Sequence, residues 1–195
     1  LGSDILKNYD IVIIGAGPGG YVAAIRARQL GAKVALIEKQ DIGGVCLNIG
    51  CIPTKALIKS AKVYKTIMNA EQFGIDIIDK DTVKVNWPAV IKRKDDVVKK
   101  LTGGVKTLLT KNGVEIYQGI GNIKSPTEVE INGDLIKAKN IIIATGASPI
   151  IPPIPGVKEA FDKGIILTSK EALSLPELPK KIVIIGGGVI GIEFA

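Results

Sequence analysis

Short apolar runs and a helical pattern alternate in the first forty residues. The run DIVII (10–14) stops at the glycine-rich stretch GAGPGG, and KVALIEK (33–39) is a second apolar run. The segment YVAAIRARQLGA lies between them, with apolar residues at helical spacing: Val22, Ile25, Ala27 and Leu30. The pattern predicts a strand–helix–strand unit of roughly thirty residues, with the helix packed on a sheet.

Two longer helical patterns follow. One runs through about TKALIKSAKVYKTIMNA and has Pro53 near its beginning, where the missing amide proton of proline costs little. The other contains the lysine-rich run IKRKDDVVKK (91–100), whose lysines are predicted to lie on a solvated face. Its apolar residues recur at spacings that predict a buried stripe: Val90, Val97, Leu101, Val105 and Leu108.

The rest of the chain predicts a small antiparallel piece and then a second domain. VEIYQG, EVEING and LIKAKNIIIATG indicate antiparallel strands that lead into a final buried strand, Ile141–Ala144. SPIIPPIPG (148–156) indicates a domain boundary, and TSKEALSL a short helix after it. KKIVIIGGGVIGIEFA then begins another strand, glycine turn and helix. We expect a domain over 1–150, a linker and the truncated start of a second domain over 151–195, and therefore a fragment.

Composition and charge exclude some classes of partner. The chain is 46% hydrophobic and 23% charged, with 26 Lys+Arg against 19 Asp+Glu. Nucleic-acid binding is disfavoured because aspartates interrupt the basic run and no aromatic residue is interleaved for base stacking. No apolar run reaches the roughly 18 residues of a membrane span, and LGSDILKNYD lacks the features of a secretory signal. We expect a soluble, cytoplasmic protein that binds neither nucleic acid nor membrane.

The first glycine motif is Gly15-x-Gly17-x-x-Gly20. In a dinucleotide-binding motif the first glycine permits the tight turn, the second lets the backbone approach a pyrophosphate, and the third lets helix and strand pack closely. Glu38 follows about twenty residues later and can accept hydrogen bonds from both ribose hydroxyls. The alternative is a loop that merely turns the chain.

A second motif, Gly186-x-Gly188-x-x-Gly191, follows KIVII in the same order. The residue that would distinguish NAD from NADP in this motif lies beyond residue 195. Two such motifs suggest two dinucleotides, one held permanently and one exchanged.

Cys46 and Cys51 are the only cysteines, and the chain has no histidine. A zinc site needs about four ligands, so we predict no metal site. A small structural bridge is one alternative, worth roughly 2 kcal/mol. On a regular helix the two Cα atoms would be roughly 8 to 9 Å apart, whereas a disulfide needs less than about 7 Å. A bonded pair therefore requires a distorted helix start. Gly43, Gly44 and Gly50 keep the backbone bare, which favours the other alternative, a redox disulfide beside a flat cofactor.

GGVCLNIGCIPTKAL, together with GAGPGG, IIIATG and GGGVIGIEFA, resembles the pyridine nucleotide–disulfide oxidoreductases over essentially the whole chain. The cysteine motif is most similar to that of the members that oxidise dihydrolipoamide. Mercuric reductases and other thiol–disulfide reductases of the family are the nearest rivals. The resemblance implies an α/β fold: a Rossmann-like FAD-binding domain, with a parallel sheet, helices and a small antiparallel piece, followed by the start of a Rossmann-like NAD-binding domain.

The resemblance also implies roles for residues. Electrons from protein-bound dihydrolipoamide would pass through a Cys46–Cys51 disulfide and FAD to NAD. Cys46 would exchange with the dithiol, and Cys51 would lie against the flavin. Lys55 would lie near the reactive edge of the flavin and pair with Glu193; the alternative is a solvated lysine and an ordinary helix residue. The implied cofactor-binding residues are Gly15, Gly17, Pro18, Gly20, Glu38, Lys39, Gly44, Cys46, Cys51, Lys55, Gly119, Ala144, Thr145 and Gly146 for FAD, with Gly186, Gly188 and Gly191 for NAD.

The implied partners belong to the whole protein. FAD would be bound tightly and NAD transiently, in a homodimer that acts on the lipoyl domain of a 2-oxo acid dehydrogenase complex or of the glycine cleavage system. The family's general base is a histidine near its C-terminus, so this chain alone is not expected to turn over lipoamide. Two alternatives come from other classes: a flavin-binding electron-transfer module without a dithiol substrate, and a nucleotide-binding regulatory protein.

Overall fold

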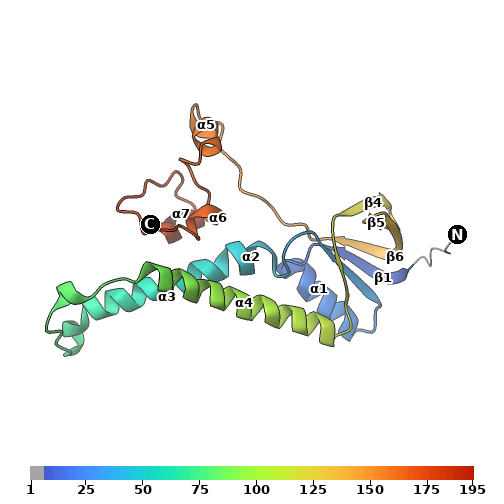
Figure 1. Ribbon diagram of the computed structural model, residues 1–195. Coiled ribbons are helices and arrows are strands. Elements are labelled where there is room, and N and C mark those ends of the chain that lie inside the picture. Colours follow the sequence, from blue (N-terminus) through green and yellow to red (C-terminus); the bar gives the residue numbers. More distant parts are fainter. Residues whose placement is uncertain (1–6) are drawn as a thin grey trace. The chain divides into compact units, whose positions relative to one another are not determined.

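The computed structural model describes residues 7–195. The chain divides into two compact units, each built from two separate stretches of the sequence, which the colours of Figure 1 follow from blue to red. The first unit joins the chain up to Asn48 with Lys99–Ser148, and the second joins Ile49–Val98 with Pro149–Ala195. Helix α4 (Trp87–Lys111) contributes its first half to the second unit and its second half to the first.

The described residues of the first unit form a six-stranded sheet with the order β3-β2-β1-β6-β5-β4. The pairs β1–β2, β1–β6 and β2–β3 are parallel, whereas β4–β5 and β5–β6 are antiparallel. The strands are β1 (Asn8–Ile14), β2 (Val34–Glu38), β3 (Glu115–Gln118), β4 (Gly121–Ser125), β5 (Glu128–Ile131) and β6 (Asp134–Ile143). With α1 (Pro18–Gln29) as the crossover from β1 to β2, this confirms the predicted Rossmann-like α/β fold with a small antiparallel piece.

The centre of the sheet is its most buried part. All five residues of β2 (VALIE) are buried, as expected for a parallel strand covered on both faces. Helix α1 contacts β1 and β2, and its buried residues are small: Gly20, Ala24 and Ala27. The prediction that Val22 and Leu30 face the sheet is wrong, because they are 55% and 70% exposed. Small residues allow α1 to approach the strands closely, so the larger side chains point outward.

Two strand predictions need correction. VEIYQG was assigned to the antiparallel piece, but β3 pairs in parallel with β2 at the outer edge of the main sheet. The final strand is longer and less buried than predicted. It runs over the whole of β6, ends at Ile143, and leaves Ile143 66% exposed. Its principal element contacts are with β1 and β5, whereas α1 contacts β1 and β2, so its last residues lack the helical cover that buries β2.

The buried face of α4 also differs from the predicted stripe. Val105 is buried as expected, but Leu101 and Leu108 are 41% and 52% exposed. Leu109 is fully buried instead, and Lys94 is 3% exposed within a run predicted to be solvated. Spacings of eleven and four place Lys94, Val105 and Leu109 on one helical face. Near the C-terminal end of α4 the buried face is therefore shifted by one position, from the predicted Leu108 to Leu109.

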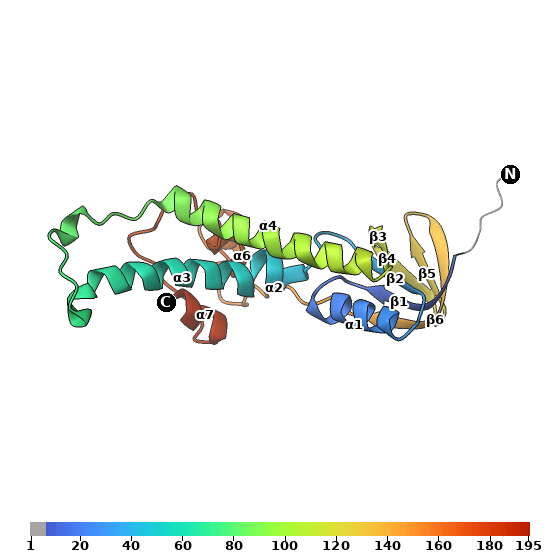
Figure 2. The same cartoon turned by 90° about the horizontal axis from the view of Figure 1, so that it is seen from below.

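In the second unit, α3 (Cys51–Met68) and the first half of α4 lie side by side (Figure 2). Arg93 Nη1 donates a hydrogen bond to Ala56 O at 2.9 Å between them. The other elements of this unit are η1 (Ala70–Phe73), η2 (Lys80–Thr82), α5 (Val157–Asp162), α6 (Ser169–Ala172) and α7 (Val189–Phe194).

Two elements were predicted after the proline-rich stretch 148–156, a short helix and a strand, and only the helix is found. The short helix is confirmed as α6, which begins with a capping box between Thr168 and Glu171. The predicted strand KIVII is wrong, since residues 181–185 have no strand structure and Val183 is 90% exposed. A strand requires a neighbour for its backbone groups, and no described strand pairs with this segment.

Within residues 7–195, no helix is both long and apolar enough to cross a membrane.

Candidate functional site

The turn after β1 is built so that only glycine fits at several positions. Gly15 has φ +104°, and a Cβ there would lie 2.2 Å from Ala144 O. A Cβ on Gly20 would lie 1.7 Å from Gly15 O, so the third glycine lets α1 start directly on the turn. Gly44 has φ +58° and would place a Cβ 2.6 Å from Gly17 Cα.

Gly17 differs from these glycines. It is the N-cap of α1 with φ −70° and ψ −176°, a conformation open to any residue. The nearest atom to a Cβ at this position would be Gly44 Cα at 3.8 Å, an ordinary contact. The fold itself therefore does not require glycine there, and its absent side chain leaves open space at the start of α1.

Glu38, at the end of β2, ties the glycine turn to the sheet. Its side chain is 8% exposed; Oε2 accepts from Ala16 N at 2.6 Å and Oε1 accepts from Gln40 N at 2.8 Å. Its backbone oxygen accepts from Gly119 N at 2.8 Å. This structural role was not predicted. Each carboxylate oxygen keeps a second lone pair, which leaves room for a ribose hydroxyl.

The carboxyl ends of the parallel strands meet at this edge of the sheet. Ala144 N, after β6, donates to Ile14 O at 2.8 Å, and Gly119, after β3, has φ +148° beside the Asn132 side chain. From β1 the chain continues to β2 on one side, and β6 pairs on the other; in open α/β sheets ligands bind at such a switch point. The structure thus brings together Gly15, Gly17, Gly20, Glu38, Gly44, Gly119 and Ala144, while Pro18, Lys39, Thr145 and Gly146 lie exposed nearby in sequence.

The two cysteines lie on different helices. Cys46 is half-buried on α2 (Gly44–Ile49), and Cys51 is the exposed first residue of α3. Gly50, with φ −143° and ψ −119°, separates the helices. A disulfide between these cysteines was expected to require a distorted helix start. The helix is in fact interrupted at Gly50, between Cys46 and Cys51.

Side-chain hydrogen bonds stabilise the ends of both helices. Thr54 Oγ1 donates to Gly50 O at 2.7 Å in the first turn of α3, and Asn48 Nδ2 donates to Ile42 O at 3.1 Å and to Gly44 O at 2.9 Å. Sequence reasoning missed Asn48 and Thr54, although both residue types commonly bond to nearby backbone. Lys55 is exposed four residues after Cys51, and hence on the same face of α3.

The second glycine motif repeats the local geometry of the first. Gly186 has φ +110°, and a Cβ on Gly191 would lie 2.2 Å from Gly186 O. Gly188 is the N-cap of α7 with φ −73° and ψ 176°. The turn therefore forms even though no strand precedes it. Glu193, on α7, and Lys55 are both exposed, and no ion pair joins these two described residues; the predicted pair is not brought together here.

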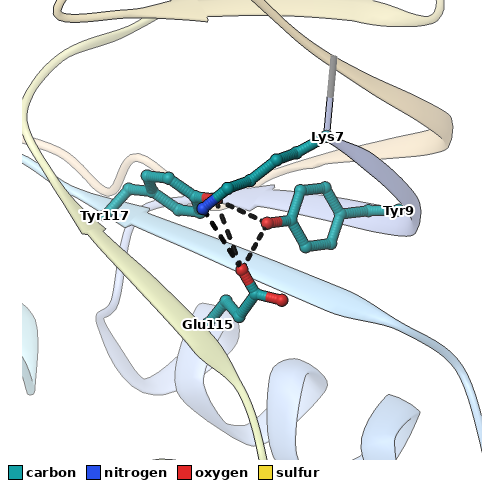
Figure 3. Close-up of polar contacts among 4 residues, drawn as sticks. All are labelled: Lys7, Tyr9, Glu115 and Tyr117. Atoms are coloured by element: carbon teal, nitrogen blue, oxygen red, sulfur yellow. Dashed lines mark hydrogen bonds and ion pairs between the residues drawn. The ribbon is translucent and has the colours of Figure 1, made fainter. Parts of the chain in front are cut away.

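A polar cluster lies at the opposite end of the strands (Figure 3). Tyr9 Oη donates to Glu115 Oε2 at 2.6 Å and lies 2.5 Å from Tyr117 Oη; Lys7 Nζ is 3.8 Å from Glu115 Oε2. Burial, together with the bond to Glu115, raises the pKa of Tyr9. The hydrogen bond from Tyr9 lowers the pKa of Glu115. These residues cover one edge of the core and make no contact with the glycine turn that the structure records.

The donor set does not suggest a metal centre. Among residues 7–195, no group of three or more His, Cys, Asp or Glu side chains could hold a metal ion.

Comparisons with known proteins agree with this geometry. Residues 9–195 match the sequence model of the family described as "Pyridine nucleotide-disulphide oxidoreductase". The chain is 58% identical over 189 residues to the dihydrolipoyl dehydrogenase of Acholeplasma laidlawii, covering 97% of this chain and 56% of the relative. It is 48% identical over 200 residues to the dihydrolipoyl dehydrogenase of Bacillus subtilis, covering 96% and 41%. The chain therefore spans about half the length of the curated relatives it matches.

A solved structure is also similar. The Cu(II) complex of an HOCl-induced flavoprotein disulfide reductase from Escherichia coli matches with a TM-score of 0.76 and 32% identity. The match covers 94% of this chain and 38% of the other.

Proposed function

The chain belongs to the pyridine nucleotide–disulphide oxidoreductase family, and from this premise we propose that it forms the FAD-binding part of a dihydrolipoyl dehydrogenase. The domain limits of the proposal are 1–150 for the FAD-binding domain and 151–195 for the start of the NAD-binding domain. The whole protein would oxidise protein-bound dihydrolipoamide and reduce NAD. The similarity to two dihydrolipoyl dehydrogenases over at least 96% of the chain supports this reaction.

The observation that best supports a nucleotide site is that the fold leaves room for a side chain at Gly17, yet the residue there is glycine. Gly15, Gly20 and Gly44 are required by backbone contacts shorter than 3 Å, but Gly17 is not. Its missing side chain leaves space in front of the N-terminus of α1, where the pyrophosphate of a dinucleotide binds in this motif. The residues present therefore fit FAD, which would supply a two-electron acceptor when bound.

The cysteine pair would perform the exchange with the substrate. One thiolate of the dihydrolipoyl group attacks Cys46 Sγ in the Cys46–Cys51 disulfide, so that a mixed disulfide forms and Cys51 leaves as a thiolate. The second substrate thiol then displaces Cys46. The substrate becomes the cyclic disulfide, the protein holds two electrons as a Cys46 thiol and a Cys51 thiolate, and the two substrate protons pass to Cys46 and to a base. Cys51, the first residue of α3, would lie against the flavin.

Other residues would bind and orient. Glu38 would bind the ribose while holding Ala16 in place, and Lys55 would pair with Glu193 beside the flavin. Pro18, Lys39, Gly119, Ala144, Thr145 and Gly146 would line the FAD site, and Gly186, Gly188 and Gly191 the transient NAD site. We propose that the full-length protein is a homodimer and acts on a lipoyl domain.

The test uses the full-length protein and one variant. The purified wild type should carry stoichiometric flavin and reduce NAD with dihydrolipoamide, followed by absorbance. Gly17→Val should lose more than about 90% of the flavin, because the side chain occupies the pyrophosphate path, while circular dichroism stays unchanged. A variant that keeps its flavin would contradict the site, and a yellow wild type that is inactive with dihydrolipoamide but active with mercuric ions would contradict the reaction.

A further inference from the structure

Lys94 is a buried cation in a helix whose other lysines are exposed. It is 3% exposed, and its ammonium group has three acceptors within the second unit. Nζ donates to Leu173 O at 3.0 Å and to Ser174 Oγ at 3.2 Å, and it pairs with Asp95 Oδ1 at 2.8 Å. A buried ammonium is costly unless its hydrogen-bond donors are satisfied, and here each of its three protons has an acceptor.

The contacts of Lys94 fall on the end of α6. Leu173 is the C-cap residue of this four-residue helix and is 2% exposed. The last carbonyls of a helix lack intrahelical partners and carry partial negative charge. A lysine at this end therefore donates hydrogen bonds to these carbonyls and offsets their partial charge. Lys94 is therefore a C-terminal cap supplied by another helix.

A second donor holds the same segment. Trp87 Nε1 donates to Leu175 O at 2.9 Å. Trp87 and Lys94 are seven residues apart on α4 and hence on one face. The segment Leu173–Leu175 is thus fixed to α4 at two points two helical turns apart.

The segment Leu173–Leu175, which Lys94 and Trp87 hold, comes shortly before the second glycine motif in the chain. After Leu175 no helix or strand is formed until α7, which carries the second glycine motif. Among the described residues, Leu173–Leu175 is the last stretch before that motif with a recorded hydrogen bond to another element. We propose that Lys94, assisted by Trp87, is a positioning residue that fixes where the second dinucleotide-binding motif starts. This inference rests on the proposed function and assigns Lys94 to the nicotinamide half-reaction.

The kinetic test uses Lys94→Met in the full-length holoenzyme, with Lys100→Met as the matched control from an exposed position of α4. Lys94→Met should raise the KM for NAD about tenfold, the factor expected for losing hydrogen bonds from a charged donor. Flavin reduction by dihydrolipoamide, measured by anaerobic stopped flow, should stay within about twofold of the wild type, because that step does not use the second motif. Lys100→Met should leave both steps unchanged. Equal losses in the two half-reactions of Lys94→Met would overturn the assignment.

Hydrogen exchange provides a readout that does not depend on activity. In Lys94→Met the amides of residues 169–175 should exchange faster, while those of β1 keep their protection. If β1 also loses protection, Ser174→Ala removes one acceptor but keeps the Lys94 side chain with its two other acceptors, and should give the local effect alone. Unchanged exchange at residues 169–175 in both variants would overturn the inference. A wild type unable to oxidise dihydrolipoamide would contradict the proposed function and leave the exchange result to decide on Lys94.

Discussion

At the scale of single residues, the cluster of Figure 3 predicts how stability depends on pH. The bond from Tyr9 lowers the pKa of Glu115, so ionised Glu115 stabilises the fold above its unfolded pKa of about 4.3. This contribution is lost as the pH falls through the lowered pKa. Glu115→Gln should cost about 1 kcal/mol or less at neutral pH, because Glu115 is half-exposed.

The measurement is urea unfolding of the wild type and Glu115→Gln at about pH 7, 5 and 3. The difference between them should shrink toward the lowest pH. Tyr9 should have the opposite pH dependence. Because its pKa is raised in the folded state, its contribution to the free energy of unfolding is present below its unfolded pKa of about 10 and is lost as the pH rises above that value. Tyr9→Phe should flatten that alkaline loss. A pH-independent difference would show that the ionised state of Glu115 does not matter.

Residue types and spacings predicted the glycine turn well, because φ and close approach depend on local chain geometry. Gly15 and Gly20 have the turn and packing roles that the motif describes. The structural bonds of Glu38 to Ala16 and Gln40 were beyond prediction, since spacing indicates a ribose acceptor but not which backbone amides surround it. Lys94 was predicted on the wrong face because a lysine in a charged run is expected to be solvated, whereas two of its three acceptors lie 79 and 80 residues away in the sequence.

At the scale of elements, α4 shows how a helical stripe can be misassigned by one residue. The periodicity correctly indicated an amphipathic helix, but a difference of one position turns a side chain by about 100°. Leu109 is fully buried and Leu108 is 52% exposed. The β3 strand was assigned to the wrong part of the sheet for a similar reason, because local alternation does not specify the partner strand.

The pair of leucines on α4 makes a matched test of this face. Leu109→Ala should reduce the free energy of unfolding by about 2 to 5 kcal/mol, because it removes buried methyl groups and leaves a cavity. Leu108→Ala should change it by less than about 1 kcal/mol. Both are measured by urea unfolding of the same chain. Equal losses would mean that both side chains share the buried face.

At the scale of the whole molecule, two glycine turns of the same geometry lie in one chain, but only the first belongs to a formed sheet. The second turn keeps its glycine geometry without a preceding strand, which shows that the turn is local and the strand is not. A strand depends on neighbours, and the described chain offers KIVII none. Sequence reasoning therefore predicted the motif and overestimated the sheet around it.

The last prediction concerns the cysteines in the full-length holoenzyme. They lie on different helices separated by Gly50, so their sulfurs should not be equivalent. Cys51 starts the 18-residue helix α3 and is proposed to lie against the flavin, so a sulfur that donates charge to the ring there should give a long-wavelength charge-transfer absorption. Cys46→Ser should show this band without reductant, whereas Cys51→Ser should lack it and alkylate readily at Cys46. Both variants should retain flavin. Identical spectra, or the band in Cys51→Ser alone, would contradict this division of roles and favour a small structural bridge.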